Sequence, residues 1–85
     1  MGLNEDFTAA ASKVRNFSKR PSDSDMLEIY SLYKQATVGD VNIAKPTGGE
    51  ALTKWNAWNG KKGLASNHAK EQYIAKVSGL ASKYS

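Results

Sequence analysis

The sequence predicts an all-α protein: a single domain, residues 1–85, built from four short helices. Apolar residues recur every three or four positions in four separate stretches, a spacing that places them on one side of a helix. Strand signals are missing, because the chain has neither an alternating apolar and polar run nor an Asn-Gly hairpin turn. A chain of 85 residues has room for one hydrophobic core.

Residues 3–17 are expected to form the first helix. We expect Asn4 to be its N-cap, followed by Glu5 and Asp6 in the first turn, where the helix dipole favours acids. Pro21 marks its end. The apolar stripe consists of Phe7, Ala10, Ala11, Val14 and Phe17.

The second helix is expected to start after an N-cap at Ser22 and to run to Thr37, with Gly39 at its C-terminal cap. Its apolar residues cover more than half of the helix circumference. They are Met26, Leu27, Ile29, Tyr30, Leu32, Tyr33 and Ala36. Because one stripe would suffice for packing, the wide apolar surface indicates a second role.

The segment DVNIAKPTGG, residues 40–49, is the one obvious long connection. A third helix is expected at about 50–59, with Trp55 and Trp58 in the core. Ser66 is expected to cap the fourth helix. The stripe of that helix is Ala69, Tyr73, Val77, Leu80 and Tyr84.

Charge and composition exclude several classes of protein. The net charge is +4, and the chain contains no cysteine, hence no disulfide, thiolate nucleophile or cysteine zinc site. The N-terminal residues lack the long apolar core of a signal peptide or membrane span. We therefore expect a cytoplasmic monomer that does not insert stably into membranes.

Candidate catalytic groups are scarce. His68 is the sole histidine, and spacing assigns it no Ser or Asp partner. Asp23, Asp25 and Glu28 fit the first turns of a helix better than an acid–base pocket. Metal-ligand spacing and a phosphate-binding glycine loop are also absent from the sequence. We expect a non-catalytic binding protein with no catalytic residue, no metal and no cofactor.

Tyr30, Tyr33 and Lys34 stand at i, i+3 and i+4, so they share one patch of the second helix. Lys54 precedes a tryptophan on the third helix, and Tyr73 lies on the stripe of the fourth. A cation beside phenolic hydroxyls suits a phosphate, and an aromatic face stacks on a flat base. The alternative is ordinary core packing with solvated lysines, and spacing alone leaves both interpretations open.

Several motifs together resemble one known family. They are PSDSDMLEIYSLYKQATVGD at 21–40, KWNAWN at 54–59, KG at 62–63 and YIAKV at 73–77. The chain resembles the acyl-CoA-binding protein family over essentially its whole length. The resemblance implies an up-down-down-up four-helix bundle that binds, buffers and transports medium- to long-chain fatty acyl-CoA esters inside the cell. It also implies transient contact with enzymes that use acyl-CoA.

The resemblance further implies a role for individual positions. The residues that match the family's 3′-phosphate site are Tyr30, Lys34 and Lys54. Tyr73 matches the aromatic residue against the adenine, with Tyr33 nearby. Arg15 replaces a family lysine near the nucleotide phosphates. Residues matching the groove for the pantetheine and acyl chain are Ala10, Ala11, Val14, Met26 and Leu27.

The chain departs from the family pattern at residues 47–53, a segment that is about two residues shorter than is usual in the family. Here Glu50 and its neighbours stand where the family places an aromatic residue and extra lysines. We expect binding to be retained, but weaker or with a different chain-length preference. Val41, Ile43 and Leu52 are candidates to replace part of the apolar cover.

Two functions of other classes remain open. A nucleic-acid binder is compatible with KVRNFSKR at 13–20, but acids follow directly at 23–28 and no groove-reading motif is present, so we expect no nucleic-acid partner. The other alternative is a helical protein-interaction or peptide-signalling module, in which the groove face meets a partner helix.

Overall fold

The computed structural model describes residues 2–84 and contains four helices. These are α1 (Leu3–Arg15), α2 (Asp23–Thr37), α3 (Gly49–Asn59) and α4 (Ser66–Tyr84). Over this part of the chain there is no strand. The predicted all-α class and the number of helices are confirmed.

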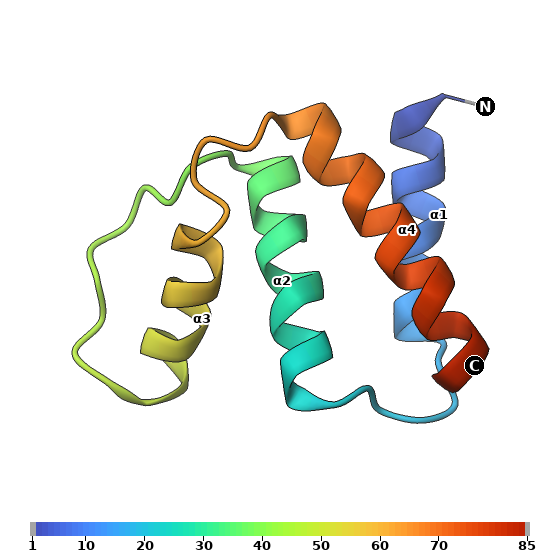
Figure 1. The fold of residues 1–85 in the computed structure, drawn as a ribbon, viewed down its shortest axis with the longest axis horizontal. Coiled ribbons are helices and arrows are strands. Elements are labelled where there is room, and N and C mark those ends of the chain that lie inside the picture. Colours follow the sequence, from blue (N-terminus) through green and yellow to red (C-terminus); the bar gives the residue numbers. More distant parts are fainter. Residues whose placement is uncertain (1, 85) are drawn as a thin grey trace.

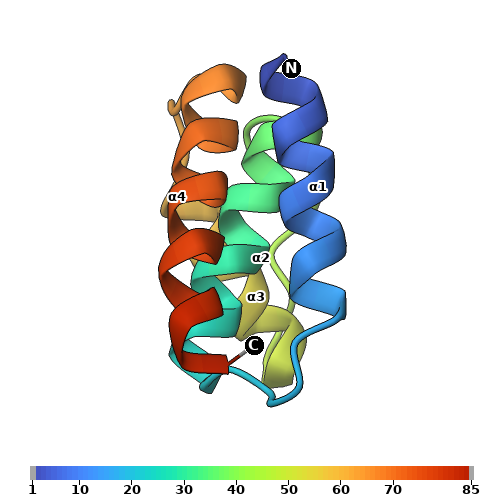
Figure 2. The same cartoon turned by 90° about the vertical axis from the view of Figure 1, so that its right-hand side faces the viewer.

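The helices α1 and α4 run in one direction and α2 and α3 in the other (Figure 1). This is the up-down-down-up order that the sequence resemblance implied. The helix α4 packs against both α1 and α2, whereas α3 packs against α2. Figure 2 shows α1 and α4 side by side at the front, with α2 and α3 behind them. The result is a flat molecule of 36 × 28 × 14 Å.

The hydrophobic core lies among α1, α2 and α4. Its buried members are Phe7, Ala10, Ile29, Leu32, Ala36, Ala69, Tyr73, Val77 and Leu80. These residues follow the three- and four-residue spacing of the predicted stripes. Since α3 attaches to the outer side of α2, the surface between these two helices is set apart from the main core.

The start of α1 differs from the prediction. Its N-cap is Gly2, and the Gly2 N–H donates to the Glu5 carboxylate at 2.8 Å. Asn4 was wrongly expected at the cap, because it lies inside the helix and its side-chain oxygen accepts a hydrogen bond from Lys70 of α4 at 2.6 Å. The helix also ends at Arg15, two residues earlier than expected.

The predicted N-cap of α2 is confirmed, because the Ser22 hydroxyl accepts a hydrogen bond from the Asp25 N–H at 3.3 Å. The C-cap is Val38, one residue before the expected Gly39. Gly39 follows it with φ 98°, and its N–H donates to the Lys34 carbonyl at 3.2 Å. Ser66 does not cap α4 as expected. It is the first helical residue, and its hydroxyl donates to the Ala36 carbonyl of α2 at 2.8 Å.

Two indole groups attach the 38–48 connection to α3. Trp58 Nε1 donates to the Gly39 carbonyl at 2.8 Å, and Trp55 Nε1 donates to the Ile43 carbonyl at 3.0 Å. Trp58 is 2% exposed, as expected of a core residue, while Trp55 is only partly buried. The connection therefore follows a defined course despite its proline and glycines.

A polar junction links the connections before α3 and before α4. Gln35 is buried, and its side-chain amide donates to Asp40 Oδ1 at 2.8 Å and to the Leu64 carbonyl at 2.9 Å. The Gly63 N–H donates to the same Asp40 oxygen at 2.9 Å. These donors lower the pKa of the Asp40 carboxyl, with the Gly63 hydrogen bond as the largest cause.

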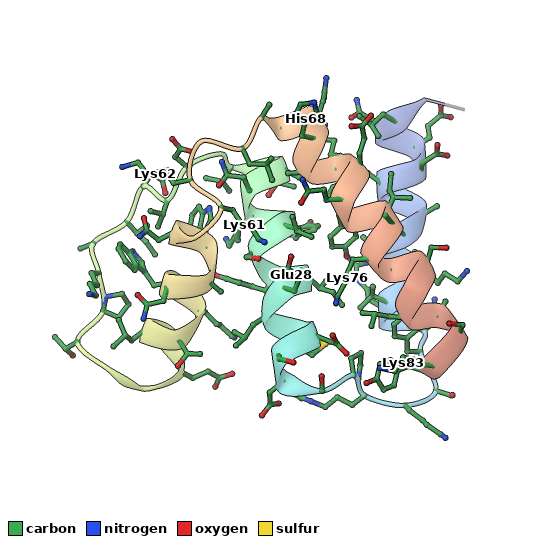
Figure 3. The ribbon with its side chains drawn as sticks, in the orientation of Figure 1. Glu28, Lys61, Lys62, His68, Lys76 and Lys83 are labelled. Carbon is green, nitrogen blue, oxygen red and sulfur yellow. The ribbon has the colours of Figure 1, made fainter. Side chains whose placement is uncertain are left out.

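Two ion pairs join α2 to other parts of the chain. Lys61 Nζ, in the turn after α3, lies 2.8 Å from Glu28 (Figure 3), and Lys76 of α4 lies 3.1 Å from Asp25. The Lys76 hydrogen bond is the largest cause of a lowered pKa at Asp25. Glu28 and Asp25 thus connect α2 to its neighbours in addition to their place near the start of the helix.

His68 is exposed on the first turn of α4 (Figure 3). Considering the helices of residues 2–84, none has the length and apolar character needed to cross a membrane.

Candidate functional site

Two surfaces of α2 differ in burial. One surface is buried in the core through Ile29, Leu32 and Ala36. The patch of Tyr30, Tyr33 and Lys34 is partly open to solvent, as in Tyr33, which is 37% exposed. The apolar surface of this helix therefore extends beyond the residues that form the core.

A cavity of about 650 Å³ lies between α2 and α3. Its lining residues are Arg20, Asp23, Met26, Leu27, Tyr30, Glu50, Thr53 and Lys54. Four of the predicted site residues therefore share one cavity: Met26, Leu27, Tyr30 and Lys54. Apolar side chains and a cation meet there, a common composition for small-molecule sites.

A second cavity, of about 360 Å³, adjoins the first. It is lined by Tyr30, Ile43, Pro46, Glu50, Ala51, Lys54, Trp55 and Trp58. Tyr30, Glu50 and Lys54 belong to both cavities. Below, the two cavities together are called the α2–α3 cleft.

Two lysines contact aromatic rings at this cleft. Lys54 Nζ lies 5.6 Å from the ring centroid of Tyr30, and Lys34 Nζ lies 5.3 Å from that of Trp58. Both distances fall within the range of cation–π attraction. Because Trp58 lines the smaller cavity, the structure brings Tyr30, Lys34 and Lys54 to one region, although they come from two helices.

Tyr33 and Tyr73 belong to a different cluster, formed with Phe7 of α1. The ring centroids of Phe7 and Tyr33 are 5.5 Å apart in a stacked arrangement, and Tyr73 lies 4.9 Å from Phe7 and 5.9 Å from Tyr33. Tyr73 is only 3% exposed, so Tyr33 offers most of the open aromatic surface. This cluster resembles a stacking surface on one side and core on the other.

The pKa of Tyr73 is raised, first by burial and second by Tyr33, while the charge of Arg15 acts in the opposite direction. Arg15 itself is exposed at the end of α1. Arg15 therefore lies near enough to Tyr73 to influence it electrostatically.

The predicted groove residues of α1 lie elsewhere. Ala10 is buried in the core, and Ala11 and Val14 pack against it half-buried. None of the three lines the α2–α3 cleft. The structure therefore joins Met26 and Leu27 to the lysine region and leaves the three α1 positions on another side of α2.

Sequence reasoning missed several lining residues. Glu50 stands one helical turn before Lys54, and its carboxylate lies 3.5 Å from Lys54 Nζ. That i, i+4 spacing is a signal that could have identified it. Among the suggested replacements for the apolar cover, Ile43 lines the smaller cavity, whereas Val41 and Leu52 line neither.

Fold and site together describe a small helical bundle with a cleft lined by apolar, aromatic and charged side chains. A family model described as "Acyl CoA binding protein" matches residues 4–77. The acyl-CoA-binding protein homolog of Drosophila melanogaster is 48% identical over 84 residues, covering 96% of this chain and 98% of the relative. The acyl-CoA-binding protein of Dictyostelium discoideum is 48% identical over 80 residues, covering 92% and 95%.

A solved structure agrees with these relatives. Acyl-CoA-Binding Protein 2 of Oryza sativa has a TM-score of 0.90 at 37% identity, covering 96% of this chain and 93% of the rice chain. The chain belongs to the acyl-CoA-binding protein family, which confirms the resemblance found in the sequence.

Proposed function

We propose that this protein binds medium- to long-chain fatty acyl-CoA esters without catalysis, and so buffers and carries them in the cytoplasm. The observation that carries the proposal is the joint position of Lys54 and Tyr30 at a cleft with an apolar wall. A cation beside a phenol suits a phosphate, and the adjoining apolar wall suits a hydrocarbon chain. Family membership supports the same ligand.

The proposed phosphate end of the site consists of Tyr30, Lys34 and Lys54, which would hold the 3′-phosphate of CoA. Each charge-assisted hydrogen bond contributes about 1.5–3 kcal/mol before the cost of desolvation is subtracted. Lys34 and Lys54 both contact aromatic rings at the cleft, which supports assigning them to one phosphate.

The proposed adenine contact is the aromatic cluster. The ring of Tyr33 is partly exposed to solvent and is stacked on the ring of Phe7. This contact orients the Tyr33 ring for a second stacking partner. Tyr73 supports this surface from within, and Arg15 supplies positive charge for the nucleotide phosphates. Arginine keeps the charge of the family's lysine but presents a planar fork of donors.

The acyl end of the proposed site is apolar. Met26 and Leu27 line the larger cavity. The assignment of Ala10, Ala11 and Val14 to the pantetheine and acyl path is supported by the family resemblance alone, since these residues lie outside the α2–α3 cleft. Each methylene that is removed from water contributes at most about 0.8 kcal/mol. Affinity is therefore proposed to rise with chain length until the apolar surface is filled.

The short 47–53 segment modifies this site. It supplies Glu50 and Thr53 to the cleft, and the apolar cover on that side comes from Ile43 and Pro46 of the preceding connection. We expect a weaker grip on the acyl chain than an aromatic cover would give. The carrier needs no cofactor or metal, acts as a monomer, and releases its ligand to acyl-CoA-using enzymes during transient contacts.

Titration followed by two-dimensional NMR tests the proposed site directly. Palmitoyl-CoA is added to the isotopically labelled protein, and amide shifts are mapped on residues 2–84. The proposal predicts one set of shifts over Tyr30, Tyr33, Lys34 and Lys54, with little change at the exposed Glu71. Shifts confined to other surfaces, or none at all, would overturn it.

A further inference from the structure

Glu50 occupies a position that an anionic ligand would be expected to avoid. Its side chain lines both cavities of the α2–α3 cleft. Its carboxylate lies 3.5 Å from Lys54 Nζ, and Lys54 is the cation that also contacts the Tyr30 ring. An acid thus stands directly beside the lysine to which we assign the phosphate.

The charges lining the cleft cancel. The charged lining residues are two cations, Arg20 and Lys54, and two acids, Asp23 and Glu50. Each cation has an acid within reach, because Arg20 lies 3.6 Å from Asp23 just as Lys54 lies 3.5 Å from Glu50. The formal charges of the lining residues therefore sum to zero, although the whole chain carries +4.

A purely structural account of Glu50 is available. It lies in the first turn of α3, where an acid interacts favourably with the helix dipole, and it forms an i, i+4 pair with Lys54. Both roles stabilise the helix slightly. Neither of them requires the carboxylate to line the cleft, and neither predicts any effect on ligand selection.

The ion pair between Glu50 and Lys54 is weak. The Lys54 side chain is 45% exposed and that of Glu50 is 81% exposed, and ion pairs at such exposure are weak. A phosphate that approaches Lys54 competes with the carboxylate for the ammonium group and lies close to a like charge. A ligand without that phosphate leaves the pair intact.

We propose that Glu50 is a specificity-determining residue whose carboxylate competes with the ligand phosphate for Lys54, and that it thereby lowers the preference for esters carrying the 3′-phosphate. This inference rests on the proposed function, since it names the ligand group that meets Lys54. Glu50 acts through Lys54 and makes no favourable contact with the ligand.

The test is calorimetric titration of the native sequence and of Glu50→Gln with palmitoyl-CoA and with 3′-dephospho-palmitoyl-CoA at one ionic strength. Gln keeps the size and hydrogen-bonding capacity of the side chain and removes its charge. We expect Glu50→Gln to bind palmitoyl-CoA about two- to fivefold more tightly, the scale of one exposed ion pair. Affinity for the dephospho ester should change less than about twofold.

Two further variants isolate the cause. Glu71→Gln makes the same change of net charge at an exposed position of α4 that lines neither cavity, and it should leave both affinities unchanged. In a Lys54→Gln background, the gain from Glu50→Gln should vanish, because the contested cation is gone.

Each outcome bears on the inference separately from the proposed function. Tight binding of palmitoyl-CoA with no change in Glu50→Gln would overturn the inference and leave the carrier function intact. If Glu50→Gln bound palmitoyl-CoA more weakly, Glu50 would instead hold Lys54 in place for the ligand. If the affinity for both esters rose equally, the effect would be that of a general electric field. Either result would contradict competition between the carboxylate and the 3′-phosphate. Absence of binding in both proteins would overturn the proposed function together with the inference.

Discussion

The ammonium group of Lys54 on α3 lies 5.6 Å from the ring centroid of Tyr30 on α2. These two residues are 24 positions apart in the chain, and both line the two cavities of the cleft. Their contact joins the apolar wall of the cleft to the lysine that we assign to the phosphate. The predictions below follow from this arrangement and from the network that supports it.

Replacing Lys34 should weaken binding through the 3′-phosphate. Lys34→Ala removes one charge-assisted hydrogen bond, a loss of about 1.5–3 kcal/mol, or roughly 10- to 150-fold in Kd for palmitoyl-CoA. Calorimetry with palmitoyl-CoA and its 3′-dephospho analogue measures the effect. Lys62→Ala is a matched control, because it removes the same charge at an exposed position, whereas Lys34 contacts the Trp58 ring at the cleft. An equal loss for the dephospho analogue would show that the assigned role is wrong.

Affinity should depend on the length of the acyl chain. Each added methylene should tighten binding by at most about 0.8 kcal/mol until the apolar surface near Met26 and Leu27 is full, after which Kd should level off. A series of esters from eight to about twenty carbons, titrated under one set of conditions, gives the curve. A Kd independent of chain length from the first member onward would contradict an acyl groove.

Acid should destabilise the fold in part through Asp40. Its pKa is lowered by the Gly63 N–H and the Gln35 amide, so the unfolded chain binds this proton more readily than the folded one. The stabilisation is present above the ordinary value of 3.8 and is lost as the pH falls through the lowered folded value. Asp40→Asn should therefore lower the free energy of unfolding at neutral pH.

Urea unfolding of Asp40→Asn and of the native sequence, at a series of pH values from about 7 to 2, measures this contribution. The difference between the two proteins should be largest above about pH 5 and shrink below it. Some acid sensitivity should persist in the variant, because Lys76 also lowers the pKa of Asp25. A difference that stayed constant over the whole range would rule out the linkage to Asp40.

The end of α2 should require glycine at position 39. Gly39 has φ 98°, and a Cβ built there meets no atom within 4 Å, so Gly39→Ala costs backbone strain alone, about 1–2 kcal/mol. Gly79 is the control. It lies inside α4 without a positive φ, a Cβ built there is equally free of contacts, and Gly79→Ala should raise the free energy of unfolding by up to about 1 kcal/mol. Similar costs for both variants, measured by urea unfolding, would count against the strain.

The helices were predictable where their signals are local. Ser22 and Gly39 act on backbone groups within a few residues, so the sequence near them contains the whole interaction. Asn4 and Ser66 misled the prediction because their side chains bond to partners 66 and 30 residues away, on other helices. Such partners exist only once the helices have packed.

The site divides in the same way. The i, i+3, i+4 spacing of Tyr30, Tyr33 and Lys34 predicted one patch on α2. The helix pattern placed Lys54 on the third helix, and only its assignment to the same site came from the resemblance to the family. The burial of Tyr73 and the separation of Ala10 from the cleft depend on how α1 and α4 pack, which spacing does not encode. Glu50 was overlooked as a member of the site, although its spacing from Lys54 was visible in the sequence.

The most direct test of the central claim is isothermal titration with palmitoyl-CoA, CoA and palmitate in separate experiments. If the phosphate end, with Lys34 and Lys54, and the apolar wall form one site, the ester should bind one to one and far more tightly than either fragment. Equal affinity for palmitate and palmitoyl-CoA, or no binding of the ester, would contradict the account.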